Sequence, residues 1–200
     1  MRILGLTGGI GMGKTTVANM LRRAGFPVYD SDAMVHRLQG PNGKAVAAMG
    51  RLVPEALTTD DKGRPTLDRP ALRRAVSENP ELIKCFERIV HPLVFEERNK
   101  FLARCRRQRV KWVVLDVPLL FETGGDKQCD KVVVVSAPRR TQIKRIARRR
   151  GMTVADAERM IARQMPDHEK RRRADVIIHT GLSMADTRRE VRALVRSLRT

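Results

Sequence analysis

The sequence predicts an α/β fold in which a parallel β-sheet with a glycine-rich loop is flanked by helices and interrupted by two helical insertions. Within the first 30 residues, a strand, a glycine-rich loop, a helix and a second strand follow one another, which is a βαβ unit. Apolar runs typical of buried parallel strands return near residues 112, 132 and 176. Segments with helical periodicity lie between these runs, and a chain of 200 residues suits one compact domain.

The βαβ unit begins with a largely apolar segment, Arg2–Thr7, that ends at glycines, as a buried parallel strand does. The helix that follows is predicted from apolar residues spaced i, i+3, i+4 and i+7, and Gly25 stands where a glycine ends a helix. The apolar face of this helix consists of Val17, Met20, Leu21 and Ala24. A short strand over residues 26–29 then leads into Asp30-Ser31-Asp32.

The remainder of the chain alternates between helical segments and short apolar strands. Strands are predicted over residues 112–118, 132–135 and 176–178. Turn sequences at 40–43 and 60–65 divide the first helical insertion. Capping boxes at Thr153-Val154-Ala155-Asp156 and Ser183-Met184-Ala185-Asp186 predict two helix starts, and the last helix carries Val191, Leu194, Val195 and Leu198 on one face.

These patterns predict a single domain in three parts. The core covers about 1–32, 110–138 and 174–200, and the helical insertions cover about 33–109 and about 139–173.

Composition excludes several classes of protein. No apolar run approaches the roughly 20 residues that span a bilayer, and no signal-peptide pattern is present, so we expect a cytoplasmic protein without a membrane partner. Three widely spaced cysteines predict reduced thiols.

The 41 Lys and Arg residues against 22 Asp and Glu give a net charge of +19, which is compatible with nucleic-acid binding. Because aromatic residues are scarce and no nucleic-acid-binding module is present, we expect no nucleic-acid partner.

The loop at Gly8–Thr15 matches the pattern G-x-x-x-x-G-K-[ST] in full. Its glycines allow the backbone N–H groups to surround phosphate oxygens, at the positive end of the helix that follows. Lys14 is expected to reach the β- and γ-phosphates, and the Thr15 hydroxyl is expected to bind Mg²⁺. The predicted ATP-binding residues of this segment are Gly9, Gly11, Met12, Gly13, Lys14, Thr15 and Thr16.

Two strand ends carry acidic residues suited to phosphoryl transfer. Asp32 is the candidate general base, because ligand crevices of α/β sheets form at strand ends; the alternative is that Asp32 only caps the following helix. Asp30 is expected to bind Mg²⁺ through water or to hold the loop. Asp116 fits a magnesium-binding position at the end of an apolar strand, or a structural carboxylate.

A phosphate-binding loop serves ATPases, GTPases and small-molecule kinases. A GTPase needs a guanine-reading N-K-x-D motif, which the sequence lacks, and large motor ATPases need a longer chain. A small kinase therefore remains the leading class. A kinase for a nucleoside, nucleotide or sugar is one alternative, and a basic nucleic-acid-binding NTPase is another.

From end to end, the sequence resembles the dephospho-CoA kinase family. The combination and order of six segments carry the resemblance, since the glycine loop alone is widespread. The segments are Gly5–Gly11, Val28–Asp32, the runs Asp68–Arg73 and Ile89–Pro92, the run Val117–Glu122, and Gln164-Met165-Pro166 with Lys170 and Ala174-Asp175. The sequence departs from the family at Met12, where serine is usual, and at His179-Thr180, where Asp-Asn is usual.

The resemblance implies a fold like that of nucleoside monophosphate kinases, with 33–109 as the acceptor-binding region and 139–173 as a mobile lid. It implies an ATP- and Mg²⁺-dependent phosphorylation of the ribose 3′-hydroxyl of dephospho-CoA, the final step of coenzyme A synthesis, by a monomer or small homo-oligomer. Asp32 matches the family's catalytic aspartate, and Arg139, Arg145 and Arg149 match its nucleotide-facing arginines, Arg139 as a catalytic residue. Acceptor contacts are expected from Thr7, Asp32, His91 and Leu119.

Overall fold

A computed structural model describes residues 1–148 and 152–200. The chain forms two compact units: Met1–Tyr29 together with Cys105–Thr200 make up the first, and Asp30–Arg104 make up the second. Long helix α5 (Leu82–Arg107) begins in the second unit and ends in the first.

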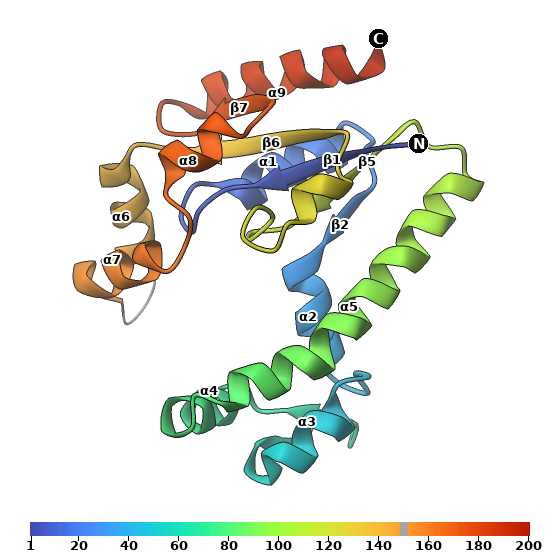
Figure 1. Cartoon of the computed structure of the whole chain (residues 1–200), viewed down its shortest axis with the longest axis vertical. Helices are drawn as coiled ribbons and strands as arrows, with labels where there is room; N and C mark the ends of the chain where they lie inside the picture. Colours follow the sequence, from blue (N-terminus) through green and yellow to red (C-terminus); the bar gives the residue numbers. More distant parts are fainter. Residues whose placement is uncertain (149–151) are drawn as a thin grey trace. The chain divides into compact units, whose positions relative to one another are not determined.

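The first unit is built on a five-stranded sheet in the order β2-β5-β1-β6-β7 (Figure 1). Strand β1 pairs in parallel with β5 and with β6, and β6 pairs in parallel with β7. The strands are β1 (Arg2–Thr7), β2 (Val28–Asp30), β5 (Trp112–Asp116), β6 (Lys131–Ser136) and β7 (Val176–His179). The predicted parallel-sheet core is therefore confirmed, and its carboxyl edge is where ligand crevices form in such sheets.

Both faces of the sheet are covered, because successive residues of a strand point to opposite faces. Val133 and Val135 of β6 join a core with helices α1 (Lys14–Arg23) and α9 (Met184–Arg199). The alternate residues, Val132 and Val134, pack instead against Leu120, Phe121 and the partly buried Met165, and helix α8 (Asp167–Arg172) contacts β6. Figure 1 shows α9, in red, lying along the sheet beside β7.

The segment predicted as a lid contains helices α6 (Arg139–Ala147), α7 (Val154–Ala162) and α8. Helices α6 and α7 pack against each other. The predicted capping boxes are confirmed: Thr153 and Asp156 begin α7, and Ser183 and Asp186 begin α9. By its contacts this segment belongs to the first unit, and its motion as a lid stays a prediction.

The second unit is mainly helical and has its own apolar core. It comprises α2 (Ser31–Gln39), α3 (Val46–Leu52), the 3₁₀ turn η1 (Pro54–Ala56), α4 (Arg69–Glu78) and most of α5. A two-stranded antiparallel hairpin of β3 (Leu57–Thr59) and β4 (Pro65–Leu67) surrounds the predicted turn at 60–65. The sequence predicts the turn but not the strands, because both strands are only three residues long and all of β3 is exposed.

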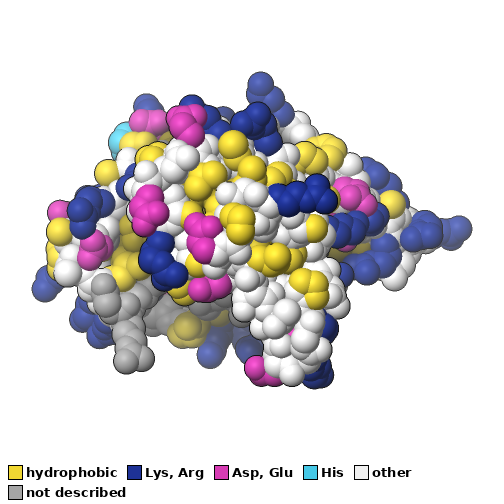
Figure 2. Space-filling model, turned by 90° about the horizontal axis from the view of Figure 1, so that it is seen from below, with side chains coloured by type: hydrophobic (Ala, Val, Ile, Leu, Met, Phe, Trp, Pro, Cys, Tyr) yellow, Lys and Arg dark blue, Asp and Glu magenta, His cyan; other side chains and the backbone are white. Residues whose placement is uncertain are grey.

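The surface is basic and mixed in character. On the face shown in Figure 2, Lys and Arg side chains are spread over much of the surface, with acidic and apolar side chains among them. In the part of the chain that the structure describes, no helix combines the length and the apolar composition needed to cross a bilayer.

Candidate nucleotide and phosphoryl-transfer site

The glycine loop lies between β1 and α1, as its motif requires. Gly11 and Gly13 have φ values of 76° and 89°, in the left-handed region where a side chain is disfavoured. Gly13 directly precedes Lys14, the first residue of α1, so the positive end of the helix dipole faces the loop. This combination makes an anion-binding site from backbone groups alone.

Two glutamines from the segment 139–173 hold Ile10, in the middle of the loop. The Gln142 side-chain amide on α6 donates to the Ile10 carbonyl at 2.8 Å. The Ile10 N–H donates to Gln164 Oε1, just beyond α7, also at 2.8 Å. Both contacts span more than a hundred residues of sequence, and sequence analysis did not single out Gln142.

An ion pair joins the loop to the end of β5. Lys14 Nζ lies 2.5 Å from Asp116 Oδ1, and the Asp116 side chain is only 1% exposed. The two groups expected to act on a magnesium-bound nucleotide are thus adjacent. Asp116 therefore lies beside the loop, and this position fits both of its predicted roles, magnesium binding and structural support.

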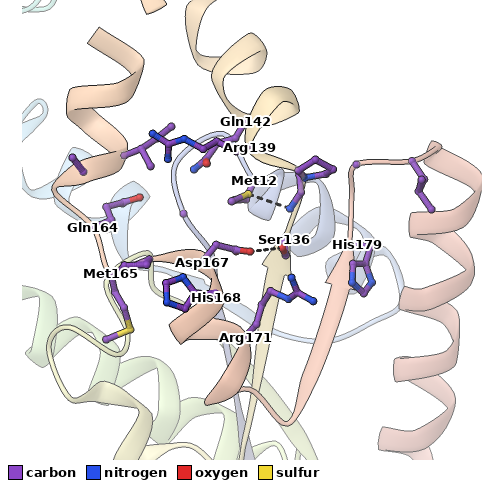
Figure 3. Close-up of a pocket in the computed structure, with 18 residues that line it drawn as sticks. Met12, Ser136, Arg139, Gln142, Gln164, Met165, Asp167, His168, Arg171 and His179 are labelled. Atoms are coloured by element: carbon purple, nitrogen blue, oxygen red, sulfur yellow. Dashed lines mark hydrogen bonds between the residues drawn. The ribbon is translucent and has the colours of Figure 1, made fainter. Parts of the chain in front are cut away.

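A cavity of about 800 Å³ opens beside the loop, at the carboxyl ends of β6 and β7 (Figure 3). Arginine and histidine side chains line it together with apolar ones. The lining includes Gly9, Met12, Ser136, Arg139, Gln142, Ile161, Gln164, Met165, Asp167, His168, Arg171, His179 and Leu182. A mostly apolar cavity with a few convergent polar and cationic groups suits a ring system attached to an anion.

Two contacts fix the wall of this cavity, both marked in Figure 3. The Met12 side chain is 2% exposed and its sulfur accepts the Ala137 N–H at 3.1 Å. Met12 therefore fills the core where the family usually has serine, and its own N–H donates to the Gly9 carbonyl at 3.1 Å. Ser136 donates to Asp167 Oδ2 at 2.7 Å, which ties β6 to α8. Neither Ser136 nor Asp167 carried a signal in the sequence.

The donor set near the loop is suited to Mg²⁺. Thr15 is an exposed residue in the first turn of α1, and the Asp116 carboxylate lies next to Lys14, so both residues carry oxygen ligands near the loop. Among residues 1–148 and 152–200, no group of three or more His, Cys, Asp or Glu side chains is placed to hold a metal. A magnesium ion at Thr15 and Asp116 would take its other ligands from phosphate oxygens and water.

The two aspartates at the junction of β2 and α2 have distinct surroundings. Asp30 is the N-cap of α2, and its Oδ1 accepts the Ala33 N–H at 2.9 Å. Asp32 lies in the first turn of α2 and is exposed. The alternative in which Asp32 caps the helix is therefore wrong, because the helix begins two residues earlier than expected and Asp30 holds that position.

The predicted arginines differ in their contacts. Arg139 lines the cavity with an exposed side chain. Arg145 donates to the Gly11 carbonyl at 3.3 Å and to the Thr180 hydroxyl at 3.0 Å, so its guanidinium is engaged with the protein. Arg149 lies outside the described residues. Contacts of all three with ATP stay predictions.

Comparison with known proteins identifies the family. The family model described as dephospho-CoA kinase matches residues 2–186. The chain belongs to the dephospho-CoA kinase family. A dephospho-CoA kinase from Gluconobacter oxydans is 48% identical over 204 residues, which cover 100% of this chain and 98% of the relative. One from Rhodospirillum rubrum is 47% identical, covering 96% of this chain and 89% of the relative.

Solved structures share the fold of this chain. A crystal structure of a Thermus thermophilus protein has a TM-score of 0.79 and 36% identity, covering 98% of this chain and 97% of the other. Dephospho-CoA kinase from Campylobacter jejuni has the same fold, with a TM-score of 0.72, 24% identity, and coverage of 98% and 96%. The predicted resemblance, the P-loop kinase fold and the assignment as a kinase are confirmed.

The residues predicted to contact the acceptor belong to both units. His91 is exposed on α5, beside Pro92, and lines a surface depression with Lys84, Glu87 and Arg88. Leu119 is 41% exposed in the segment after β5. Thr7 is fully buried and donates to the Pro118 carbonyl at 3.0 Å. Their contacts with an acceptor stay predictions.

A buried ion pair connects two of the segments that resemble the family. Lys170 of α8 is 0% exposed, and its Nζ lies 2.7 Å from Glu122 Oε1 and 3.3 Å from the Pro118 carbonyl. Glu122 also accepts the Met165 N–H at 3.0 Å. Burial acts to raise the pKa of Glu122, but the hydrogen bonds from Lys170 and from the backbone outweigh it and hold the pKa below its usual value. The run after β5 and the end of segment 139–173 are thereby fixed to each other.

Proposed function

We propose that this chain transfers the γ-phosphate of ATP to the ribose 3′-hydroxyl of dephospho-CoA, giving coenzyme A and ADP in the last step of coenzyme A synthesis. One observation carries the proposal. A complete phosphate-binding loop, with its lysine beside a strand-end aspartate and a cavity next to it, occurs in a chain that matches the dephospho-CoA kinase model over residues 2–186.

The donor binds to the first unit. The loop N–H groups and the helix dipole hold the β- and γ-phosphates, and the Lys14 ammonium neutralises charge on the transferred group. The nucleoside occupies the cavity between the loop and the ends of β6 and β7, which Arg139 lines with an exposed side chain. Its guanidinium stabilises negative charge that spreads over the phosphoryl group during transfer.

Thr15 and Asp116 would hold Mg²⁺. When bound, the ion neutralises phosphate charge and helps to align the γ-phosphate with the attacking oxygen.

The acceptor hydroxyl is oriented by a carboxylate. Asp32 is the general base, since its side chain is exposed and makes no cap interaction, whereas Asp30 is occupied in capping α2. His91 and Leu119 contact the rest of the acceptor, and Thr7 supports the strand end beneath the loop through its bond to Pro118. Residues 139–173 act as a lid that excludes water during transfer.

An ADP-release assay over a panel of acceptors tests this proposal. Dephospho-CoA, coenzyme A, adenosine and shikimate are each supplied with ATP and Mg²⁺, and the product is identified by mass. We expect turnover with dephospho-CoA and none with coenzyme A, whose 3′ position already carries phosphate. Turnover with adenosine or shikimate in place of dephospho-CoA would refute the proposed acceptor.

A pair of lysine variants separates chemistry from general loss of charge. Lys14→Ala is expected to lower kcat by about 10²–10³, because it removes a charge directed at the transferred group. Lys100→Ala is the matched control, since Lys100 also pairs with carboxylates, Glu96 and Glu97, but on the exposed surface of α5. Equal activity of the two variants would contradict the role of Lys14.

A further inference from the structure

Three successive carbonyls of the glycine loop each accept a hydrogen bond from a side chain elsewhere in the chain. Gln142 donates to Ile10 O at 2.8 Å, Arg145 donates to Gly11 O at 3.3 Å, and Thr180 donates to Met12 O at 2.5 Å. Two donors come from α6, and the third follows β7 directly. These three bonds fix the orientation of three successive peptide planes in the loop.

A hydrogen bond that fixes the carbonyl of one residue also fixes the direction of the N–H group of the next residue. In a trans peptide the C=O of one residue and the N–H of the next point in opposite directions. The three bonds therefore turn the N–H groups of Gly11, Met12 and Gly13 away from α6 and from Thr180. Within the described part of the chain, the Gly11 and Gly13 N–H groups donate to no other residue, whereas Met12 N–H donates to Gly9 O at 3.1 Å. Backbone N–H groups turned inward in this way are what a phosphate-binding loop uses.

Thr180 connects these bonds to one another. Its side chain belongs to a residue that is 7% exposed, and the hydroxyl accepts from Arg145 Nη1 at 3.0 Å while it donates to Met12 O. Its carbonyl accepts from Arg145 Nη2 at 2.5 Å, and its N–H donates to Ser136 O at 2.9 Å. A Cβ added to Gly13 would lie 3.1 Å from Thr180 Oγ1, so the hydroxyl sits directly against the loop.

We infer that Thr180 and Gln142 are positioning residues that set the direction of the Gly13 and Gly11 N–H groups toward the β-phosphate of the donor, and that Arg145 holds Thr180 in place. The inference rests on the proposed ATP site. Arg145 then acts on the nucleotide through the loop, by holding Gly11 and Thr180. This role applies to Thr180, which belongs to the pair His179-Thr180 where the sequence departs from the usual residues of the family.

Nucleotide titration of Thr180→Val measures this effect, because valine keeps the shape and removes the hydroxyl. We expect ADP binding to weaken about tenfold, the value of one lost hydrogen bond to a charged group. AMP lacks the β-phosphate, so its affinity should change little. Thr180→Ser restores the hydroxyl and should restore ADP binding. Gln142→Met removes a second donor and should also weaken ADP more than AMP, which keeps the test decisive if Thr180→Val does not fold.

Thr187→Val is the matched control. Thr187 is also buried, at 3% exposure, and its hydroxyl donates to the His179 carbonyl at 3.1 Å without touching the loop. It should lose similar thermal stability and keep its ADP affinity. Unchanged ADP binding in Thr180→Val and Gln142→Met, or equal losses for ADP and AMP, would overturn the inference. Failure of the unaltered protein to bind ADP would instead refute the proposed donor site.

Discussion

Replacing Glu122 with glutamine tests the buried ion pair that joins the run after β5 to α8. The change keeps the side chain's shape and an acceptor for Met165 N–H, but it leaves the Lys170 ammonium, 0% exposed, without its counter-ion. Breaking a fully buried pair costs about 3–5 kcal/mol. Because the Glu122 side chain is 21% exposed and water screens part of the interaction, we expect a loss of about 2–3 kcal/mol in the free energy of unfolding.

Urea unfolding followed by tryptophan fluorescence measures this loss. Trp112 is the one tryptophan of the chain and is 3% exposed in β5, within the same unit as the ion pair. Adding Lys170→Met to Glu122→Gln should recover part of the lost stability, since an apolar side chain replaces the uncompensated buried charge. A loss below about 1 kcal/mol for Glu122→Gln, within the range of exposed pairs, would refute this reasoning, as would a double variant less stable than the single one.

Three further predictions concern pH, the acceptor aspartates and the lid. Because the pKa of Glu122 is lowered in the folded state, its ion pair stabilises the protein fully only above the ordinary pKa of a glutamate. The urea midpoint of the unaltered protein should therefore fall as the pH decreases from 5 to about 3 and the Glu122 carboxylate is protonated. The urea midpoint of Glu122→Gln should depend less on pH over the same range. Asp32→Asn should lower kcat by about 10²–10⁴ with little change in ATP affinity. Asp30→Asn should keep most of kcat, since asparagine also caps helices, and a larger kcat loss than in Asp32→Asn would reverse the assignment. Amide exchange over 139–173 should slow when ATP and dephospho-CoA are added together, and unchanged exchange would contradict lid closure.

Much of the sheet could be predicted because its signals are local. β1 was predicted with its observed bounds, Arg2–Thr7, since an apolar run that ends at glycines has few other interpretations. Both capping boxes were confirmed for the same reason: Ser or Thr and an Asp three residues later satisfy each other's backbone groups without help from the rest of the fold.

Elements with weak local signals were missed or misplaced. The β3–β4 hairpin has exposed residues on most positions, so no apolar alternation marks its strands. The start of α2 was placed after Asp32 because two aspartates, separated by one residue, are equally good caps in sequence. The backbone decides between them, since Asp30 is extended and Ser31 is already helical.

The features of the candidate site also differ in whether a local sequence signal marks them. The glycine pattern predicts that the loop can take left-handed conformations, which Gly11 and Gly13 confirm. Which way each peptide plane then faces depends on donors that are remote in sequence: Thr180 lies 168 residues from Met12, and Gln142 lies 132 residues from Ile10. A motif therefore predicts that phosphate can be bound, whereas the strength of binding depends on residues that no local pattern marks. Variation among family members at a position such as Thr180 should accordingly change nucleotide affinity while the motif itself remains intact.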